Sequence, residues 1–579
     1  MGMPGLNLCV AWAPWESGGT LLALGAVVWL VLAYRWYGRR LERRLVGPTD
    51  TPTPAHAQRD DVDFTPTKPI VLFGHHFASI AGAGPIVGPV LAVAFFGWGA
   101  TALWVLLGVV LIGAVHDYLA LMISVRHRGA SVGDIAKTCV GPSARVLFLV
   151  FVWIGLVLVI TCFCNAAADT FLEAPEIVLP TFALMGIAVL FGFLNQRVKL
   201  HIAANTAIAL VLLFASICLG FWCKIDLAHW GVPADWVRRT WLLVLIGYGV
   251  LASVLPVWVL LQPRDYIATW ILILGMAMGF AGILIEAPPL RAPAFTGFTG
   301  QPGPLWPMLF IIVACGAVSG FHCLVAGGTT SKQLDRERQG LAVGYGAMLT
   351  EGALAIMAIV CVAGGLYYAS VPEGADGFAL LPVLKSGGPI AAFGRGFGEL
   401  TRSFLRRSGE WIGVPRLGMI VGTTMVNAFV MTTLDTSVRL SRFITTELGG
   451  RHVPALRSRF VASVVPVIPA FLLALSPGAF NRIWQLFGAS NQLIAALALL
   501  VITAYLLQRG KPTRYTLAPA VFMLATTMAA LGWQAYGYLL VAAKRDYVLG
   551  STAVVLLALA VVMAVQALRA RRSMAAPSA

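Results

Sequence analysis

The sequence predicts an all-α, polytopic membrane protein with about fifteen transmembrane helices. Hydrophobic residues make up 59% of the chain and charged residues only 11%, whereas soluble domains carry about 25% charged residues. Many apolar runs are long enough to cross the roughly 30 Å hydrocarbon core of a bilayer. Two of these runs carry a proline near their centre, which predicts broken helices in corresponding halves of an inverted repeat.

The apolar runs set the expected order of helices along the chain. The first run has neither the basic front nor the small-residue cleavage site of a signal peptide, so we expect it to be retained as a span. Hydropathy places the spans at 18–34, 70–96, 99–125, 144–169, 177–194, 202–222, 240–261, 267–285, 305–328, 342–366, 412–437, 459–475, 480–507, 515–541 and 549–568.

The distribution of basic residues predicts the orientation of the chain. With the N-terminus outside, 28 of the 41 Lys and Arg residues fall on the cytoplasmic side. An excess of Lys and Arg in cytoplasmic loops is the signal that sets orientation. The N-terminus is therefore expected on the external side of the membrane and the C-terminus in the cytoplasm. The net charge of +16 then indicates topology and contact with anionic membrane lipid, and no nucleic-acid partner.

The two proline breaks and the polar stretches divide the chain into five expected segments. Between the first and second apolar runs lies a polar linker rich in Pro, Thr and Asp, which is expected in the cytoplasm. A long external stretch, 371–410, is expected to be re-entrant or to lie on the surface. The segments are 1–45 (first helix), 46–68 (linker), 69–222 (first repeat, five spans), 240–437 (second repeat, five spans) and 459–579 (accessory C-terminal helices).

The two breaks point to a substrate path. The first lies in GHHFASIAGAGPIVGPV around Pro85, and the second lies in YGVLASVLPVWVLLQPRDY around Pro256. Backbone groups freed at membrane depth must be received by protein or by a water-filled cavity. A pair of such breaks is therefore typical of a secondary transporter, although ordinary proline kinks that only admit helix packing remain an alternative.

Each break is expected to start a half-helix whose N-terminus faces the cavity. Proline suits the first helical position, because no acceptor is available there for a backbone N–H. The free amides that follow, together with the positive end of the helix dipole, favour binding of an anion such as a carboxylate. The predicted substrate-binding residues are Ser79, Gly82, Ala83, Gly84, Ile86, Val87, Ser253, Val257 and Trp258.

Ionisable groups inside apolar runs are candidates for ion coupling, because they are expensive to keep in a membrane. Histidine is the side chain most easily moved through neutral pH, and His75 and His76 could meet Asp117 from the neighbouring span. Some of these groups could instead only hydrogen bond within the helix packing, Asp169 above all. The predicted proton-coupling residues are His75, His76, Asp117, His322 and Glu351, and Asp435 is a further ionisable candidate.

A weak sodium site is the competing idea, built from the hydroxyls of Thr329 and Thr330 and from carbonyls freed at the first break. Hydroxyls in helices usually bond their own backbone, which speaks against it. Asn491 and Gln492 are expected to form hydrogen bonds between helices. The nine cysteines form no C-x-x-C pair, so no metal site or disulfide framework is predicted.

No nucleotide-binding or hydrolytic motif occurs in the chain. We therefore expect neither an enzyme nor a cofactor, and transport would be driven by an ion gradient or by the gradient of the substrate itself. A nutrient sensor would require a cytoplasmic output domain, for which the sequence has no room, and a channel would not need paired broken helices.

Five motifs in order resemble the carbon starvation protein A family from about Lys68 to the last spans: GHHFASIAGAGPIVGPV, GAVHDYLALMIS, ASVLPVWVLLQPRDYI, SGFHCLVAGGTTSKQL and FGASNQLIAALALL. The resemblance implies a bacterial inner-membrane carrier of the amino acid–polyamine–organocation superfamily, with the five-plus-five inverted repeat of the leucine-transporter type. It implies import of pyruvate with a proton under carbon limitation, or alternatively uptake of oligopeptides. A sodium-coupled carrier or a channel are weaker alternatives.

Overall fold

The computed structural model describes residues 17–60, 63–139, 141–256, 260–414, 416–476, 479–542 and 545–575. In this part of the chain helices dominate, and the strands β1 (Thr299–Gly300) and β2 (Gly303–Pro304) form one small antiparallel hairpin. Thirteen described helices are long and apolar enough to cross a membrane, and a bent helix pair makes a fourteenth span. The shorter apolar helix Arg459–Ala474 matches the remaining predicted span. The prediction of an all-α, multi-pass membrane protein is therefore confirmed.

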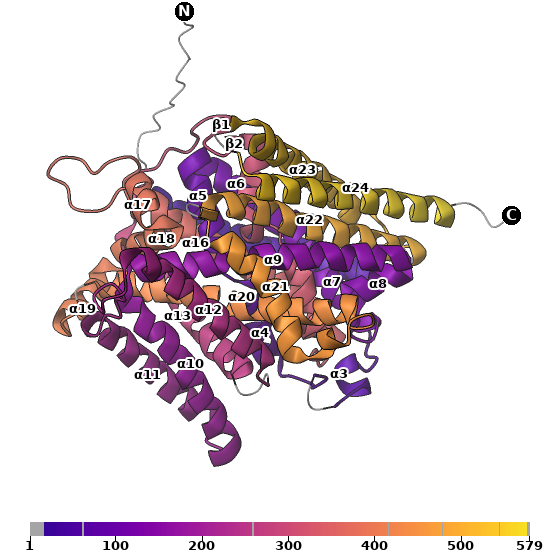
Figure 1. The fold of residues 1–579 in the computed structure, drawn as a ribbon, viewed down its shortest axis with the longest axis horizontal. Helices are drawn as coiled ribbons and strands as arrows, with labels where there is room; N and C mark the ends of the chain where they lie inside the picture. The colour runs from indigo at the N-terminus through magenta and orange to yellow at the C-terminus, as the bar shows by residue number, and fades with distance from the viewer. Residues whose placement is uncertain are drawn as a thin grey trace, which may run out of the picture.

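The helices follow one another in a single bundle (Figure 1). The first half contains α1 (Gly18–Leu32), α2 (Arg39–Leu41), α3 (Pro54–Ala57), α4 (Pro69–Ile80), α5 (Gly84–Phe96), α6 (Trp98–Gly108), α7 (Ala114–Arg126), α8 (Val132–Cys139), α9 (Pro142–Glu173), α10 (Val178–Phe193), α11 (Ile202–Trp222), α12 (Ala234–Val254) and α13 (Leu261–Glu286).

The second half of the chain follows α13 and the β1–β2 hairpin. It contains α14 (Leu305–Val313), α15 (Phe321–Gly328), α16 (Ala347–Gly364), α17 (Leu380–Ser386), α18 (Gly388–Leu400), α19 (Arg407–Trp411), α20 (Leu417–Gly449), α21 (Arg459–Ala474), α22 (Ala479–Gln508), α23 (Arg514–Leu540) and α24 (Tyr547–Ala575). In Figure 1 the α10–α11 hairpin projects at one edge of the bundle, and α23 and α24 lie together at another.

The first break is where the sequence predicts it. Helix α4 ends at Ile80 and α5 begins at Gly84, with a 45° bend between them. Ala81 has the non-helical dihedrals φ −76° and ψ 58°. Pro85 lies in the first turn of α5, where its fixed φ and missing N–H cost nothing. The predicted interruption of this span is confirmed.

The predicted break of a span at Pro256 is wrong. Helix α12 ends at Val254 and α13 begins at Leu261, and each is long enough to cross a membrane by itself. Pro256 therefore lies in the connection between two complete helices, because a proline disfavours helical dihedrals in the residue before it. The predicted spans 240–261 and 267–285 are correspondingly shifted to 234–254 and 261–286.

The second interruption lies instead in the span Leu305–Lys332. Helix α14 ends at Val313, and the chain passes through a single turn before α15 begins at Phe321. Ala314 has φ +36°, a conformation that a residue with a side chain adopts only when its surroundings hold it there. Gly316 ends the turn, Gly320 precedes α15, and no proline lies between Val313 and Phe321. A search for prolines could not find this break.

The linker 46–68 and the loop after α15 lie on one face of the bundle. The amide of Thr49 donates to the Glu337 carboxylate at 2.8 Å, and the amide of Thr67 donates to the Gln333 carbonyl at 3.1 Å. Arg126, at the end of α7, donates to the Val46 carbonyl at 3.1 Å. These bonds join the linker to the loop after α15 and to the end of α7. The distribution of basic residues predicts the same side of the membrane, the cytoplasmic side, for all three segments.

Candidate substrate and ion path

The two interrupted helices meet each other. Helix α5 packs against α14 and against the turn that follows it. A Cβ atom added to Gly84 would lie 2.6 Å from the Cβ of Cys315, and one added to Gly88 would lie 2.6 Å from the Ile312 carbonyl oxygen. Contacts this short require glycine. The glycines of the first motif therefore serve close approach to the second interruption.

The backbone amides left without an acceptor lie about one turn before the ones that the sequence predicts. Ile86 and Val87 both donate to the Ala83 carbonyl oxygen, at 3.1 and 2.9 Å, so the prediction that they remain available to a ligand is wrong. The amides of Ala83 and Gly84 have no hydrogen-bond acceptor among the described residues. Any carboxylate at this helix end would therefore be bound by Ala83 and Gly84.

Asn491 of α22 holds the second interruption together. Its side-chain oxygen accepts from the Phe321 amide at 2.9 Å, and its backbone carbonyl accepts from the Gly320 amide at 3.1 Å. Its Nδ2 donates to the Ser319 hydroxyl at 3.1 Å. The predicted hydrogen bonding between helices is confirmed for Asn491, and for Gln492, which donates to the Phe310 carbonyl at 2.6 Å. That Asn491 lies at a helix break was not predicted from the sequence.

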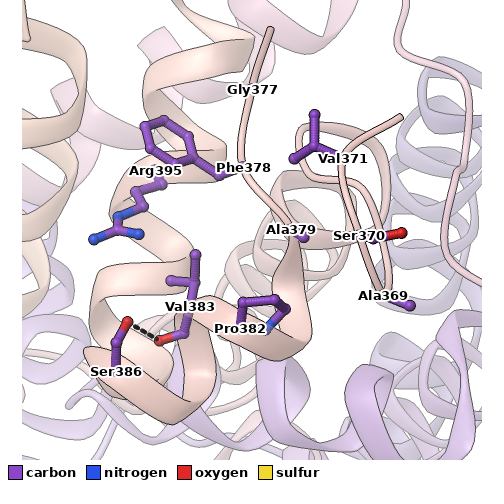
Figure 2. Close-up of a pocket in the computed structure, with 10 residues that line it drawn as sticks. All are labelled: Ala369, Ser370, Val371, Gly377, Phe378, Ala379, Pro382, Val383, Ser386 and Arg395. Atoms are coloured by element: carbon purple, nitrogen blue, oxygen red, sulfur yellow. Dashed lines mark hydrogen bonds between the residues drawn. The ribbon is translucent and has the colours of Figure 1, made fainter. Parts of the chain in front are cut away.

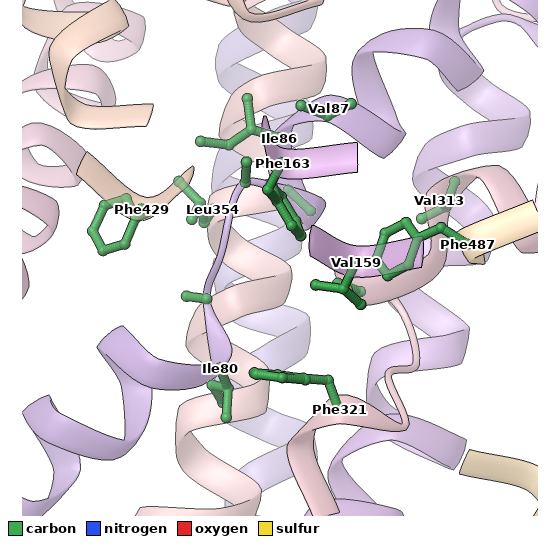
Figure 3. Packing of buried hydrophobic residues seen from close by; sticks show 14 of the residues in the cluster. Ile80, Ile86, Val87, Val159, Phe163, Val313, Phe321, Leu354, Phe429 and Phe487 are labelled. Carbon is green, nitrogen blue, oxygen red and sulfur yellow. The ribbon is translucent and has the colours of Figure 1, made fainter. Parts of the chain in front are cut away.

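Apolar side chains surround the first interruption. Figure 3 shows the short non-helical connection between Ile80 of α4 and the start of α5, where Ile86 lies, with Phe321 of α15 beside Ile80 and with Val159 and Phe163 of α9 nearby. All five side chains are buried. They exclude water from the meeting point, and electrostatic interactions there are consequently stronger than in water.

The predicted substrate residues fall into two places. Ser79, Gly82, Ala83, Gly84, Ile86 and Val87 lie together at or next to the first interruption. The Ser79 hydroxyl is bonded to the carbonyl of His75 at 2.7 Å. Ser253 lies at the end of α12 and bonds instead to Ser463 of α21 at 3.0 Å. Val257 and Trp258 lie outside the described residues.

Four buried ionisable side chains form what we call the titratable network: His116 and Asp117 of α7, His322 of α15 and Glu351 of α16. Oδ1 of Asp117 lies 2.7 Å from Nδ1 of His116, and Oδ2 of Asp117 lies 2.7 Å from Nδ1 of His322. Nε2 of His322 lies 3.4 Å from Glu351. All four side chains are 0% exposed. The sequence flagged Asp117, His322 and Glu351 separately, and the fold brings them together.

The titratable network can hold a proton. Both oxygens of Glu351 are buried without a hydrogen-bond partner among the described residues, as is Nε2 of His116. Histidine is the side chain whose ordinary pKa lies nearest to neutral pH, and a carboxyl group beside it can share its proton. Because buried charges must be balanced, a proton gained or lost here changes how well the remaining charges are compensated.

The two histidines of the first motif have other partners. Nδ1 of His76 lies 2.8 Å from the Thr330 hydroxyl, so the expected meeting with Asp117 is not formed as a hydrogen bond. Nδ1 of His75 lies 3.9 Å from the Asp265 carboxylate. Thr329 is exposed and donates to the carbonyl of Val325 at 2.9 Å. The described residues contain no group of three His, Cys, Asp or Glu side chains that could hold a metal ion.

Sequence reasoning named only one member, Asp435, of a second network. We call it the arginine network: Tyr248 of α12, Arg264 and Asp265 of α13 and Asp435 of α20. Arg264 pairs with Asp435 and with Asp265, the latter at 2.7 Å, and it donates to the Tyr248 hydroxyl at 2.9 Å. Hydropathy had placed Arg264 in a loop. The sequence signal for this network was the adjacent charged pair Arg264 and Asp265 next to an apolar run.

An open pocket of about 510 Å³ lies in the segment predicted to be external (Figure 2). It is lined by residues of 369–386, which lead into and form α17, and by Arg395 of α18. Arg395 forms a 2.5 Å ion pair with Glu173 at the end of α9. Nearby in sequence, Asp169 pairs with Arg238 at 3.0 Å, the helix-packing role considered for it.

Comparisons with known proteins agree on one family. Residues 18–377 and 380–530 match the family described as Carbon starvation protein CstA. The chain is 34% identical to the pyruvate/proton symporter BtsT of Escherichia coli, over 90% of this chain and 83% of that protein. It is 35% identical to the peptide transporter CstA of Escherichia coli, over 89% and 80%.

Among solved structures, the crystal structure of MhsT in complex with L-phenylalanine is similar with a TM-score of 0.46. That chain is 14% identical, and the match covers 86% of this chain and 99% of the other.

Proposed function

The chain belongs to the carbon starvation protein CstA family, and we propose that it imports a small carboxylate, pyruvate first, together with a proton across a bacterial inner membrane. The observation that carries this proposal is the position of the titratable network beside the meeting point of two interrupted helices. His322 lies in the first turn of α15, directly after the second interruption, and α15 packs against α4, which ends at the first interruption.

The anion and the proton would therefore bind next to each other. The amides of Ala83 and Gly84 lie at the positive end of α5, where a carboxylate is favoured. A bound anion would stabilise a protonated titratable network. By thermodynamic linkage, a protonated network would bind the anion more tightly to the same degree. His76, bonded to Thr330, is a further candidate in the same region.

Proton coupling also suits the energetics of uptake. Moving one negative charge inward against a potential that is negative inside costs about 2.3 kcal/mol per 100 mV. One accompanying proton cancels that charge movement, so a pH gradient that is alkaline inside would drive accumulation. The orientation we propose, with the N-terminus in the periplasm and the C-terminus in the cytoplasm, follows from the basic residues.

We also propose a revised repeat. Residues 69–286 and 305–508 would each begin with an interrupted helix, in the manner of the leucine-transporter type, and the α10–α11 hairpin would be an insertion in the first. Several packing partners support this division: α4 packs against α13, α14 against α22, α9 against α20 and α12 against α21. Under this division the accessory helices begin with α23.

Peptide uptake is the second candidate. Relatives of similar identity are named peptide transporters. The open pocket of about 510 Å³ in the predicted external segment also falls within the roughly 300–1,000 Å³ typical of ligand pockets. A peptide presents a carboxylate like pyruvate, but it needs more room beyond the carboxylate.

Counterflow in proteoliposomes separates the two candidates. Vesicles loaded with unlabelled pyruvate or unlabelled dialanine would be diluted into the corresponding labelled compound, and uptake would be followed with empty vesicles as the control. We expect counterflow of pyruvate. Counterflow of dialanine alone would favour the peptide candidate, and counterflow of neither would overturn the proposed function.

A further inference from the structure

We infer that Arg264 is a second docking point for the substrate's carboxylate, and that Asp435 competes with the substrate for it. The inference rests on the proposed function, because it assumes a carboxylate cargo. It concerns a different place from the helix ends at Ala83 and Gly84. It also assigns a role to an arginine that proton transfer does not need.

The charge balance of the arginine network allows such an exchange. Arg264 and Asp435 have side chains that are 0% exposed, and that of Asp265 is 5% exposed. An arginine side chain stays charged in proteins, so a carboxylate must accompany it wherever it is buried. Here two aspartates surround one arginine. One of them can be replaced by a carboxylate from outside without leaving Arg264 unpaired.

The hydrogen bonds of Arg264 are incompletely used. Its Nη1 is shared between Asp435 and the Tyr248 hydroxyl, and its Nη2 donates to Asp265. Its Nε, and Oδ1 of Asp435, are both buried without a partner among the described residues. A guanidinium binds a carboxylate best through two parallel N–H bonds. An incoming carboxylate that used the free Nε would gain a bond that neither aspartate makes.

Tyr248 supplies a hydrogen-bond donor that would remain with Asp435 after its displacement from Arg264. Its hydroxyl lies 2.7 Å from Oδ2 of Asp435, and it accepts from Arg264 at 2.9 Å. If a substrate carboxylate took the guanidinium, Asp435 would keep the Tyr248 hydroxyl as a donor. The desolvation cost of the displaced carboxylate would be reduced in this way.

The arginine network adjoins the first interrupted helix. His75 of α4 faces Asp265, and the Thr269 hydroxyl of α13 donates to the carbonyl of Gly74 at 3.0 Å. A Cβ atom added to Gly82 would lie 2.5 Å from the hydroxyl of Thr433, two residues before Asp435. The side chain of His75 is 21% exposed, so the α4 edge of the network is not sealed by the packing. The route that we infer for the carboxylate runs from the interruption along α4 to Arg264.

The rival explanation is that Arg264 and Asp435 only brace α13 against α20. The two explanations predict different signs for two substitutions. If Asp435 competes with substrate, Asp435→Asn frees Arg264 while Asp265 still balances its charge, and affinity rises. If the pair is only a brace, Asp435→Asn and Arg264→Lys both weaken the structure and neither raises affinity.

The test is equilibrium binding of labelled pyruvate and labelled dialanine to the purified full-length protein in detergent. We expect Asp435→Asn to lower Kd by about tenfold and Arg264→Lys to raise it by about tenfold or more, the range expected for one charge-assisted hydrogen bond. Asp169→Asn, which removes an aspartate from a different arginine pair, is the matched control and should leave Kd unchanged.

The outcomes separate this inference from the proposed function. Wild-type protein that binds neither compound overturns both. Wild-type protein that binds, with Kd raised or unchanged in Asp435→Asn, overturns the inference alone. Should Arg264→Lys fail to fold, the double variant Arg264→Gln/Asp435→Asn removes both charges together. The inference expects weak binding from it, and affinity equal to wild type would overturn the inference.

Discussion

The titratable network and the arginine network are both buried, but only the first contains histidine side chains. The titratable network contains two imidazoles and two carboxyl groups, side chains that can bind a proton, whereas Arg264 stays positive in proteins. The first network joins α7, α15 and α16 around the second interruption, and the other joins α12, α13 and α20 beside α4. Under the two proposals above, the titratable network would bind the proton and the arginine network would bind the anion.

The largest expected effect of a single substitution is in the arginine network. Arg264→Leu would leave Asp265 and Asp435 buried without their cation, and breaking a buried pair costs about 3–5 kcal/mol. We expect loss of the monodisperse peak in fluorescence-detected size-exclusion chromatography and a lower melting temperature in detergent. Arg264→Leu combined with Asp435→Asn should recover part of the loss. A single variant as stable as wild type would contradict the pairing.

Close packing between the two interruptions gives the next effect. Gly84→Ala would place a Cβ 2.6 Å from the Cβ of Cys315, and overpacking of this kind typically costs about 1–3 kcal/mol. We expect a lower melting temperature, and the double variant Gly84→Ala/Cys315→Gly should restore it. Gly25→Ala is the matched control, because a Cβ there would meet nothing within 4 Å. Equal melting of Gly84→Ala and Gly25→Ala would argue against contact between the interruptions.

The smallest effect belongs to an ion pair outside both networks. Arg338 pairs with Asp50 at 2.9 Å, with side chains 68% and 80% exposed. Exposed pairs contribute roughly 0–1 kcal/mol, so Arg338→Ala should change neither the melting temperature nor transport measurably. A marked loss of transport would mean that the linker has a role beyond the packing described here.

Some of this arrangement could be predicted from sequence, and the reasons for the failures are physical. The first interruption carries prolines and glycines in one run, so the chain marks it locally. The second is held by Asn491, which lies about 170 residues further along, and no local signal reveals that contact. Asp117, His322 and Glu351 could be flagged because each lies in an apolar run. Their partnership depends on the rotation of three helices, which hydropathy does not set.

Arg264 illustrates a different failure. Hydropathy windows end where charges begin, so the predicted boundaries left this residue between two spans. In the structure α13 starts at Leu261 and carries Arg264 into the bundle, where two aspartates and a tyrosine surround it. A charge at the edge of an apolar run is therefore a candidate for a buried network whenever a second charge, here Asp435, lies within another apolar run.

The most direct test of the account measures coupling and exchange in the same vesicles. Wild-type protein in sodium-free proteoliposomes should accumulate labelled pyruvate when the interior is made alkaline, and a protonophore should abolish the accumulation. In Glu351→Gln and in Asp117→Asn, the accumulated labelled pyruvate should fall by about tenfold or more relative to wild type. Counterflow should be kept, since only proton binding is removed. Accumulation that persists in both variants, or that requires sodium, would contradict the assignment of the proton to the titratable network.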